Sequence, residues 1–215
     1  MKKLLLKEFR LALHPVNVIF LALSAMLLIP SYPYYVTFFY TTLGLFFLSQ
    51  SGRENHDIEF TMMLPVTRRD LVRARVLFAA LIELAQMLVA IPFAIISQHI
   101  NRFGNMAGMD ANVAFFGLSL LMLGLYNAVF FPLYYARPWK VGKAFIIGSI
   151  VEALYVLVVE IAAHKVTFVR RYLDTPDPAY LGAKLLVLAA GMVLFIALTA
   201  LGCRQAEKKF EVVDL

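Results

Sequence analysis

Three glutamates stand inside otherwise apolar stretches of the sequence: Glu83, Glu152 and Glu160. A carboxyl group at membrane depth can carry a proton, or it can attract a cationic molecule along a water-filled path. Gln86 follows Glu83 by about one helical turn, and Tyr155 follows Glu152 by the same interval, so each pair would share a helix face. Two interpretations stay open: these side chains line a translocation pathway, or they pair within the protein and serve its packing.

Other chemistry has little support in the residue patterns. A nucleotide-binding P-loop needs Gly, four residues and then Gly-Lys-Ser/Thr, but the only Gly-Lys, Gly142–Lys143, is followed by alanine. The single cysteine, Cys203, cannot form an internal disulfide. The histidines lack metal-ligand spacing and are scattered along the chain: His14, His56, His99 and His164. We therefore expect no enzyme activity, no metal and no cofactor in this chain.

Membrane-spanning helices are the elements that would position the three glutamates. Hydrophobic residues make up 61% of the 215 residues and charged residues only 16%, a balance that soluble domains do not show. A spanning helix needs about 20 mostly apolar residues. The sequence predicts an all-α integral membrane protein, a single transmembrane domain over 1–215, with six spans at 16–29, 34–51, 76–98, 112–135, 143–163 and 180–202.

The first two spans share one stretch without formal charge, residues 11–52. A single helix of that length would measure about 63 Å, twice the hydrocarbon thickness. Pro30 and Pro33 therefore mark a turn between two spans. Ahead of them, residues 1–14 alternate basic and apolar positions, which predicts an amphipathic helix lying in the membrane interface.

The distribution of lysine and arginine predicts the orientation. Fifteen of these residues fall in the terminal segments and the second and fourth connections, and five fall on the opposite side. Because positive charge collects in cytoplasmic loops, both termini are expected in the cytoplasm of a bacterium, with the spans in its plasma membrane. The net charge of +6 is explained by the basic cytoplasmic segments that orient the protein in the membrane. No nucleic-acid partner is expected.

The second connection, residues 52–75, holds the densest group of charges in the chain. So many charges cannot sit at membrane depth, which places the segment in the cytoplasm. Asn55 or Asp57 is predicted to cap a short helix, and Pro65 is expected to end it. The simplest alternative is a basic loop that fixes the topology and binds anionic lipid headgroups.

A second, longer helix is predicted directly after this short one. Thr67 has the character of an N-cap, and Asp70, three residues on, approximates a capping box. From Thr67 to Gln98 a continuous helix would be about 48 Å long, more than the bilayer core. The third span is therefore expected to protrude by a few turns into the cytoplasm.

The stretch RENHDIEFTMMLPVTRRDLVRARVL, residues 53–77, resembles the signature of permease subunits of ABC-2 type transporters. The short six-span permeases of phenol-soluble-modulin and antimicrobial-peptide exporters are the most similar group. In that family the helix between spans two and three is a coupling helix that inserts into a cleft of a separate ATPase. The resemblance assigns coupling to Asn55, Asp57, Ile58, Glu59, Phe60, Met62, Met63, Leu64, Pro65, Arg68, Arg69 and Asp70.

The resemblance also implies the partners and the activity. A cytoplasmic ABC ATPase subunit would bind ATP and Mg, and a second copy or a related permease would complete a dimer within the lipid bilayer. The implied function is ATP-driven export of amphipathic peptides or hydrophobic small molecules. Two alternatives stay open: a proton-coupled secondary transporter that uses the intramembrane acids, and a non-transporting membrane scaffold or immunity protein.

Overall fold

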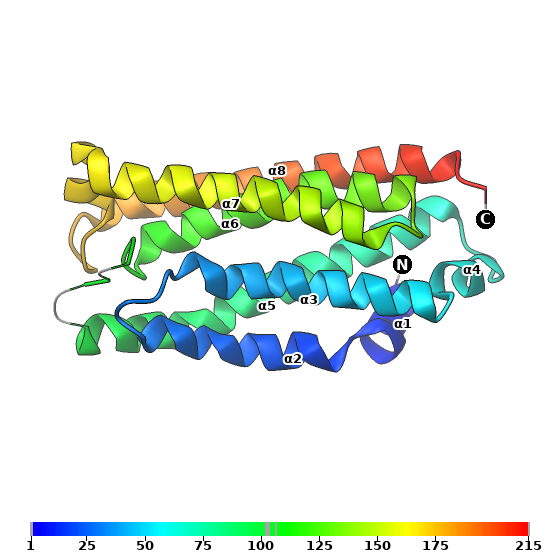
Figure 1. Ribbon diagram of the computed structural model, residues 1–215, viewed down its shortest axis with the longest axis horizontal. Coiled ribbons are helices and arrows are strands. Elements are labelled where there is room, and N and C mark those ends of the chain that lie inside the picture. The colour runs from blue at the N-terminus through cyan, green and yellow to red at the C-terminus, as the bar shows by residue number, and fades with distance from the viewer. Residues whose placement is uncertain (1, 102–103, 106, 215) are drawn as a thin grey trace.

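The computed structural model describes residues 2–101, 104–105 and 107–214, and every regular element in these ranges is a helix. The helices form an elongated bundle (Figure 1). In chain order they are α1 (Lys2–Lys7), η1 (Glu8–Ala12), α2 (Pro15–Ala22), η2 (Leu23–Leu28), α3 (Tyr35–Glu54), α4 (Asp57–Met62), α5 (Arg68–Ile100), α6 (Val113–Ala136), α7 (Val141–Lys165), η3 (Val169–Leu173) and α8 (Leu181–Glu211).

Four of the described helices are long and apolar enough to cross a membrane: α5, α6, α7 and α8. The segments 2–12 and 15–28 together make a fifth candidate, and they meet at 81°. A bend of this size suits a helix that lies along the interface before the chain turns into the membrane. Since α3 is not among these candidates, a total of six spans stays a prediction.

Local sequence signals account for the ends of several helices. Pro15 occupies the first position of α2, where a missing N–H costs no helical hydrogen bond. Thr67 is the N-cap of α5, and its Oγ1 accepts a hydrogen bond from the backbone N–H of Asp70 at 3.1 Å. The Thr67 hydroxyl also donates to Asp70 Oδ2 at 2.7 Å. The predicted cap of the long helix is therefore confirmed.

Helices α6 and α8 lie close together along most of their lengths. A Cβ added at Gly191 would overlap the backbone of Gly117, and one added at Gly117 would lie 2.5 Å from the carbonyl oxygen of Val187. Only glycine permits this approach, which is the usual way in which membrane helices gain contact area. The pair α6–α8 is thus a rigid unit on which α7 also packs.

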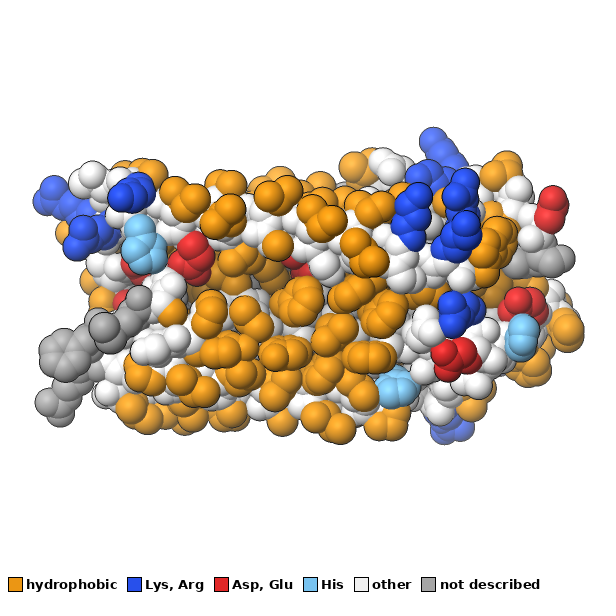
Figure 2. Space-filling model, in the orientation of Figure 1, with side chains coloured by type: hydrophobic (Ala, Val, Ile, Leu, Met, Phe, Trp, Pro, Cys, Tyr) orange, Lys and Arg blue, Asp and Glu red, His pale blue; other side chains and the backbone are white. Residues whose placement is uncertain are grey.

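The surface of the bundle separates into an apolar belt and two polar ends. Figure 2 shows hydrophobic side chains over the middle of the visible face and most of the charged side chains toward the two ends. Large apolar side chains on α5, α7 and α8 are exposed, among them Leu88, Ile95, Ile146, Leu154, Leu186 and Val193. An exposed belt of this kind marks a surface that contacts lipid.

Candidate coupling site and buried acids

Helix α4 lies at one end of the bundle, together with α1 and the end of α8 (Figure 1). We call this the α4 end. His56 precedes α4 with a left-handed φ of 50°, and its side chain makes no capping hydrogen bond. The prediction that Asn55 or Asp57 caps α4 is therefore wrong: Asn55 ends α3 instead, and the carboxylate of Asp57 is bound by cations from two other helices.

The inner face of α4 is held by an ion-pair cluster, defined by Lys7, Glu8, Asp57 and Arg75. Lys7 Nζ lies 2.5 Å from Asp57 Oδ1 and donates a hydrogen bond to Thr61 Oγ1 at 2.9 Å. Arg75 binds Asp57 through Nη2, and its Nε lies 2.6 Å from Glu8 Oε2. The cluster joins the N-terminal helical segment, α4 and α5 at one point.

The cluster keeps Asp57 ionised. Burial by itself raises the pKa of the Asp57 carboxyl, but Arg75 and Lys7 together lower it by more, so its pKa lies below the ordinary value. An ionised carboxylate between two cations favours one fixed position for α4. Lys7, Glu8 and Arg75 were missed from the sequence because they are distant from α4 along the chain, and no local pattern links them.

The outer side of α4 and of the two residues after it exposes large apolar side chains next to the polar side chains of His56 and Glu59. Phe60 is 55% exposed, Met63 is 83% exposed and Leu64 is 42% exposed, whereas Ile58 and Thr61 are buried against the bundle. We call Phe60, together with Met63 and Leu64, which directly follow the last residue of the helix, the exposed edge of α4. Large apolar side chains grouped at the end of a short helix outside the apolar belt are typical of a contact with another protein.

Two arginines assigned to coupling face the C-terminal end of α8 instead of solvent alone. Arg68 Nη1 donates hydrogen bonds to the carbonyl oxygens of Phe210, Glu211 and Val213 at 2.9, 3.0 and 2.6 Å. Arg69 Nε lies 2.5 Å from the Glu211 carboxylate. Cations at a helix C-terminus satisfy its free carbonyl groups and its dipole. The start of α5 and the end of α8 are thereby fastened together.

Glu83 and Glu152 are buried between helices, with 0% and 2% of their surfaces exposed. Asn127 Nδ2 donates to Glu83 Oε2 at 2.8 Å and to Thr199 Oγ1 at 3.1 Å. Thr42 Oγ1 donates to Glu152 Oε2 at 3.0 Å. The second oxygen of each carboxylate has no hydrogen-bond partner within the described part of the chain. Each acid is thus bound by a neutral side chain of a neighbouring helix.

The neighbours of these acids have partners of their own. Gln86 donates to Ser24 Oγ at 2.7 Å, and the Tyr155 hydroxyl donates to a backbone carbonyl of α6 at 2.9 Å. Glu160 accepts the backbone N–H of Met109 at 3.1 Å. Each of these side chains is thus bound by another part of the protein, as the packing interpretation predicts, and a role in a translocation pathway stays a prediction.

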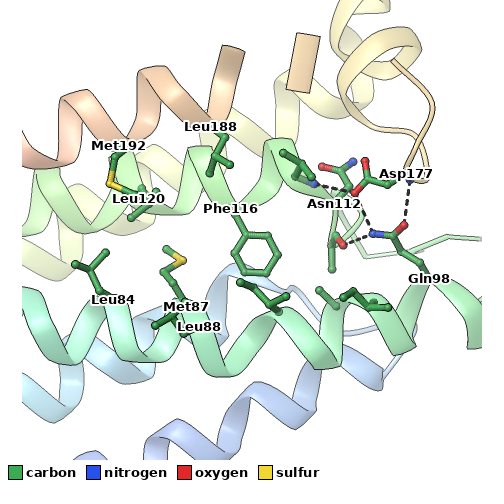
Figure 3. Close-up of a pocket in the computed structure, with 15 residues that line it drawn as sticks. Leu84, Met87, Leu88, Gln98, Asn112, Phe116, Leu120, Asp177, Leu188 and Met192 are labelled. Carbon is green, nitrogen blue, oxygen red and sulfur yellow. Dashed lines mark hydrogen bonds between the residues drawn. The ribbon is translucent and has the colours of Figure 1, made fainter. Parts of the chain in front are cut away.

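An apolar groove of about 580 Å³ lies between α5 and the α6–α8 pair (Figure 3). Gln98 and Asp177 close one end of it, where the backbone N–H of Asp177 donates to Gln98 Oε1 at 3.0 Å. Buried Lys184 binds the Asp177 carboxylate at 2.8 Å. The apolar walls include Leu84, Met87, Leu88, Phe116, Leu120, Leu188 and Met192. Glu83 and Glu152 are not among the lining residues, and no sequence pattern predicted this groove.

Comparison with known proteins adds one positive finding. A family model described as an ABC-2 family transporter protein matches residues 3–202. The matched range contains the ion-pair cluster, α4, both buried acids and all the long helices up to Gly202 in α8. No match was found among curated proteins or among solved structures.

Proposed function

Because the chain belongs to the ABC-2 family of transporter proteins, we propose that it is the permease subunit of an ATP-driven exporter. The family supports a membrane permease role and implies an ATPase subunit as partner. The observation that carries the finer proposal is α4. The helix and the two residues after it expose large apolar side chains beyond the belt of the bundle, while ion pairs of Asp57 hold its other face.

In this proposal α4 is the coupling helix, and its exposed edge docks into a cleft of the ATPase. ATP and Mg bind to that partner, since this chain has no P-loop. A movement of the docked helix would reach the N-terminal segment and α5 through the ion-pair cluster. The Arg68 contacts would carry the same movement to the end of α8. Rigid helices that move as packed bodies are a common means of such transmission.

The proposed arrangement in the membrane has six spans, with α3 as the second. An even number of spans agrees with the position of α1 and the end of α8 at the same end of the bundle (Figure 1). The excess of Lys and Arg on that side supports a cytoplasmic location in a bacterial plasma membrane. A second copy or a related permease would complete the transporter, as in similar family members.

We propose amphipathic peptides or hydrophobic small molecules as the cargo. Support for an apolar cargo comes from the groove of Figure 3, whose walls are mostly Leu, Met, Ile and Phe side chains. Export is the direction expected from the resemblance to exporter permeases. The cargo and the direction depend on the family relation, whereas the ATPase contact is argued from α4 itself.

The exposed edge of α4 provides the test. The wild-type chain is purified in mild detergent together with the ABC ATPase that remains bound to it. In the double variant Phe60→Ala/Met63→Ala, the amount of ATPase that co-purifies should fall about tenfold or more. The reason is that binding energy is concentrated in a few large side chains of an interface. The ATP turnover of the ATPase should then be the same with the variant permease as without any permease.

A matched control is Ile146→Ala on α7, whose side chain is 59% exposed, close to the 55% of Phe60. This variant should bind the ATPase as the wild type does. The unfolding temperature should stay the same in all variants, since the substituted side chains are exposed. Wild-type ATPase binding by the Phe60/Met63 variant would contradict the assignment of α4 as the coupling helix.

A further inference from the structure

A shallow hollow opens at the α4 end of the bundle, between the α6–α7 connection and the end of the chain. Its volume is about 470 Å³, and Arg137, Trp139 and Lys209 line it together with Val212 and Asp214. Trp139 is 52% exposed and Val212 is 82% exposed. The hollow thus combines two cations with exposed apolar side chains.

The two segments that wall this hollow are strongly basic. Residues 137–143 and 204–209 carry six exposed cations: Arg137, Lys140, Lys143, Arg204, Lys208 and Lys209. Within the described residues none of the six forms an ion pair with an acidic side chain. Their charge is therefore available to an external anion.

The acids of the same region are mostly engaged elsewhere. Glu207 binds Arg73 through two hydrogen bonds of 2.7 and 3.2 Å. Glu211 binds Arg69 at 2.5 Å. Asp214 is the acid that lines the hollow itself. Arginines from α5 thus neutralise the acids of α8 and leave its lysines facing outward.

The position of the hollow favours a lipid as the source of the anion. The α6–α7 connection joins two helices that are apolar enough to span a membrane, so Trp139 lies where such helices leave the hydrocarbon. Tryptophan is enriched at this depth, and basic pockets between membrane helices bind anionic headgroups. We propose that Arg137, Trp139 and Lys209 form a binding site for the phosphate-bearing headgroup of an anionic phospholipid.

Tryptophan fluorescence reports on this site alone, because Trp139 is the only tryptophan in the chain. The full-length protein is reconstituted in nanodiscs that contain phosphatidylcholine and a small fraction of lipid with brominated chains. Bromine quenches tryptophan fluorescence at short range. Brominated phosphatidylglycerol should quench Trp139 more strongly than brominated phosphatidylcholine at the same fraction, and the ratio measures the preference for the anionic headgroup.

The test variant is Arg137→Gln/Lys209→Gln. Each cation near an anionic membrane surface contributes roughly a fivefold change in binding, so the loss of two should lower the preference by roughly 25-fold. The control Arg170→Gln/Arg171→Gln removes the same charge from exposed positions in the connection between α7 and α8, and it should keep the wild-type preference. Equal quenching by both lipids in the wild type, or an equal loss in both variants, would overturn the proposal.

Two further measurements separate other sources of the anion. Inorganic phosphate added to the protein in neutral detergent should not shift the unfolding temperature, whereas phosphatidylglycerol should raise it; stabilisation by phosphate alone would contradict a lipid site. If the partner ATPase shields Trp139 from a water-soluble quencher while lipid composition has no effect, the surface is a protein contact and the lipid assignment is wrong.

Discussion

Arg75 and Glu8 form a buried ion pair, with Arg75 Nε 2.6 Å from Glu8 Oε2 and side-chain exposures of 4% and 3%. The pair joins α5 to the N-terminal segment and extends to α4 through Asp57. Burying two charges gives little net stability, but removal of one partner leaves the other without compensation. The pair is therefore suited to fixing the relative position of three helices.

The first prediction concerns this pair. In Arg75→Met, Lys7 is the one cation of the ion-pair cluster that remains beside the two carboxylates of Glu8 and Asp57. We expect the free energy of unfolding to fall by about 3–5 kcal/mol. The double variant Glu8→Leu/Arg75→Met should recover a large part of this loss. SDS titration in mixed micelles measures both values.

Arg69→Gln serves as the comparison for Arg75, because Arg69 is 59% exposed and pairs with Glu211 at the surface. The free energy of unfolding of Arg69→Gln should change little, since exposed ion pairs contribute little to stability. Equal effects of Arg69→Gln and Arg75→Met would show that the buried cluster has no special role.

The second prediction concerns the contact between α6 and α8. In Gly191→Ala the added Cβ would overlap the backbone of Gly117, so the two helices must move apart. We expect a loss of about 1–3 kcal/mol in the free energy of unfolding. Gly182→Ala is the matched control on the same helix, where a Cβ would meet nothing within 4 Å. Equal stability of the two variants would contradict the close approach of α6 and α8.

The third prediction separates packing from transport at Glu83. Asn127→Leu removes the amide that donates to the buried Glu83 carboxylate and should cost about 1–3 kcal/mol of stability. Glu83→Gln and Glu152→Gln keep an acceptor oxygen and should remain folded. Since neither acid lines the groove, cargo efflux from proteoliposomes that contain the ATPase should also persist in both.

Loss of efflux in folded Glu83→Gln or Glu152→Gln would reverse this conclusion. It would show that the ionisable group itself is required, as a translocation pathway or a proton-coupled transporter demands. Efflux that needs ATP and is indifferent to both substitutions would instead exclude the proton-coupled alternative. Circular dichroism and gel filtration of each variant would establish that it is folded before efflux is compared.

Local signals in the sequence were sufficient for several parts of the fold. The uncharged stretch at 11–52, interrupted by Pro30 and Pro33, predicted a turn that the structure has between η2 and α3. Thr67 and Asp70 predicted the start of α5 correctly. These features depend on residues within a few positions of one another, so helix propensity, proline geometry and capping determine them without the rest of the molecule.

Only the tertiary structure decided which charges meet. Asp57 looked like a helix cap in the sequence, but Lys7 and Arg75 approach it from 50 and 18 residues away. Arg68 looked like part of a docking surface, yet it reaches carbonyl groups 142 to 145 residues further along. The sequence by itself determined the apolar helices and the turn after the first of them, because these follow from local composition and proline geometry. The partners of the charged side chains follow from how those helices pack, which no local pattern encodes.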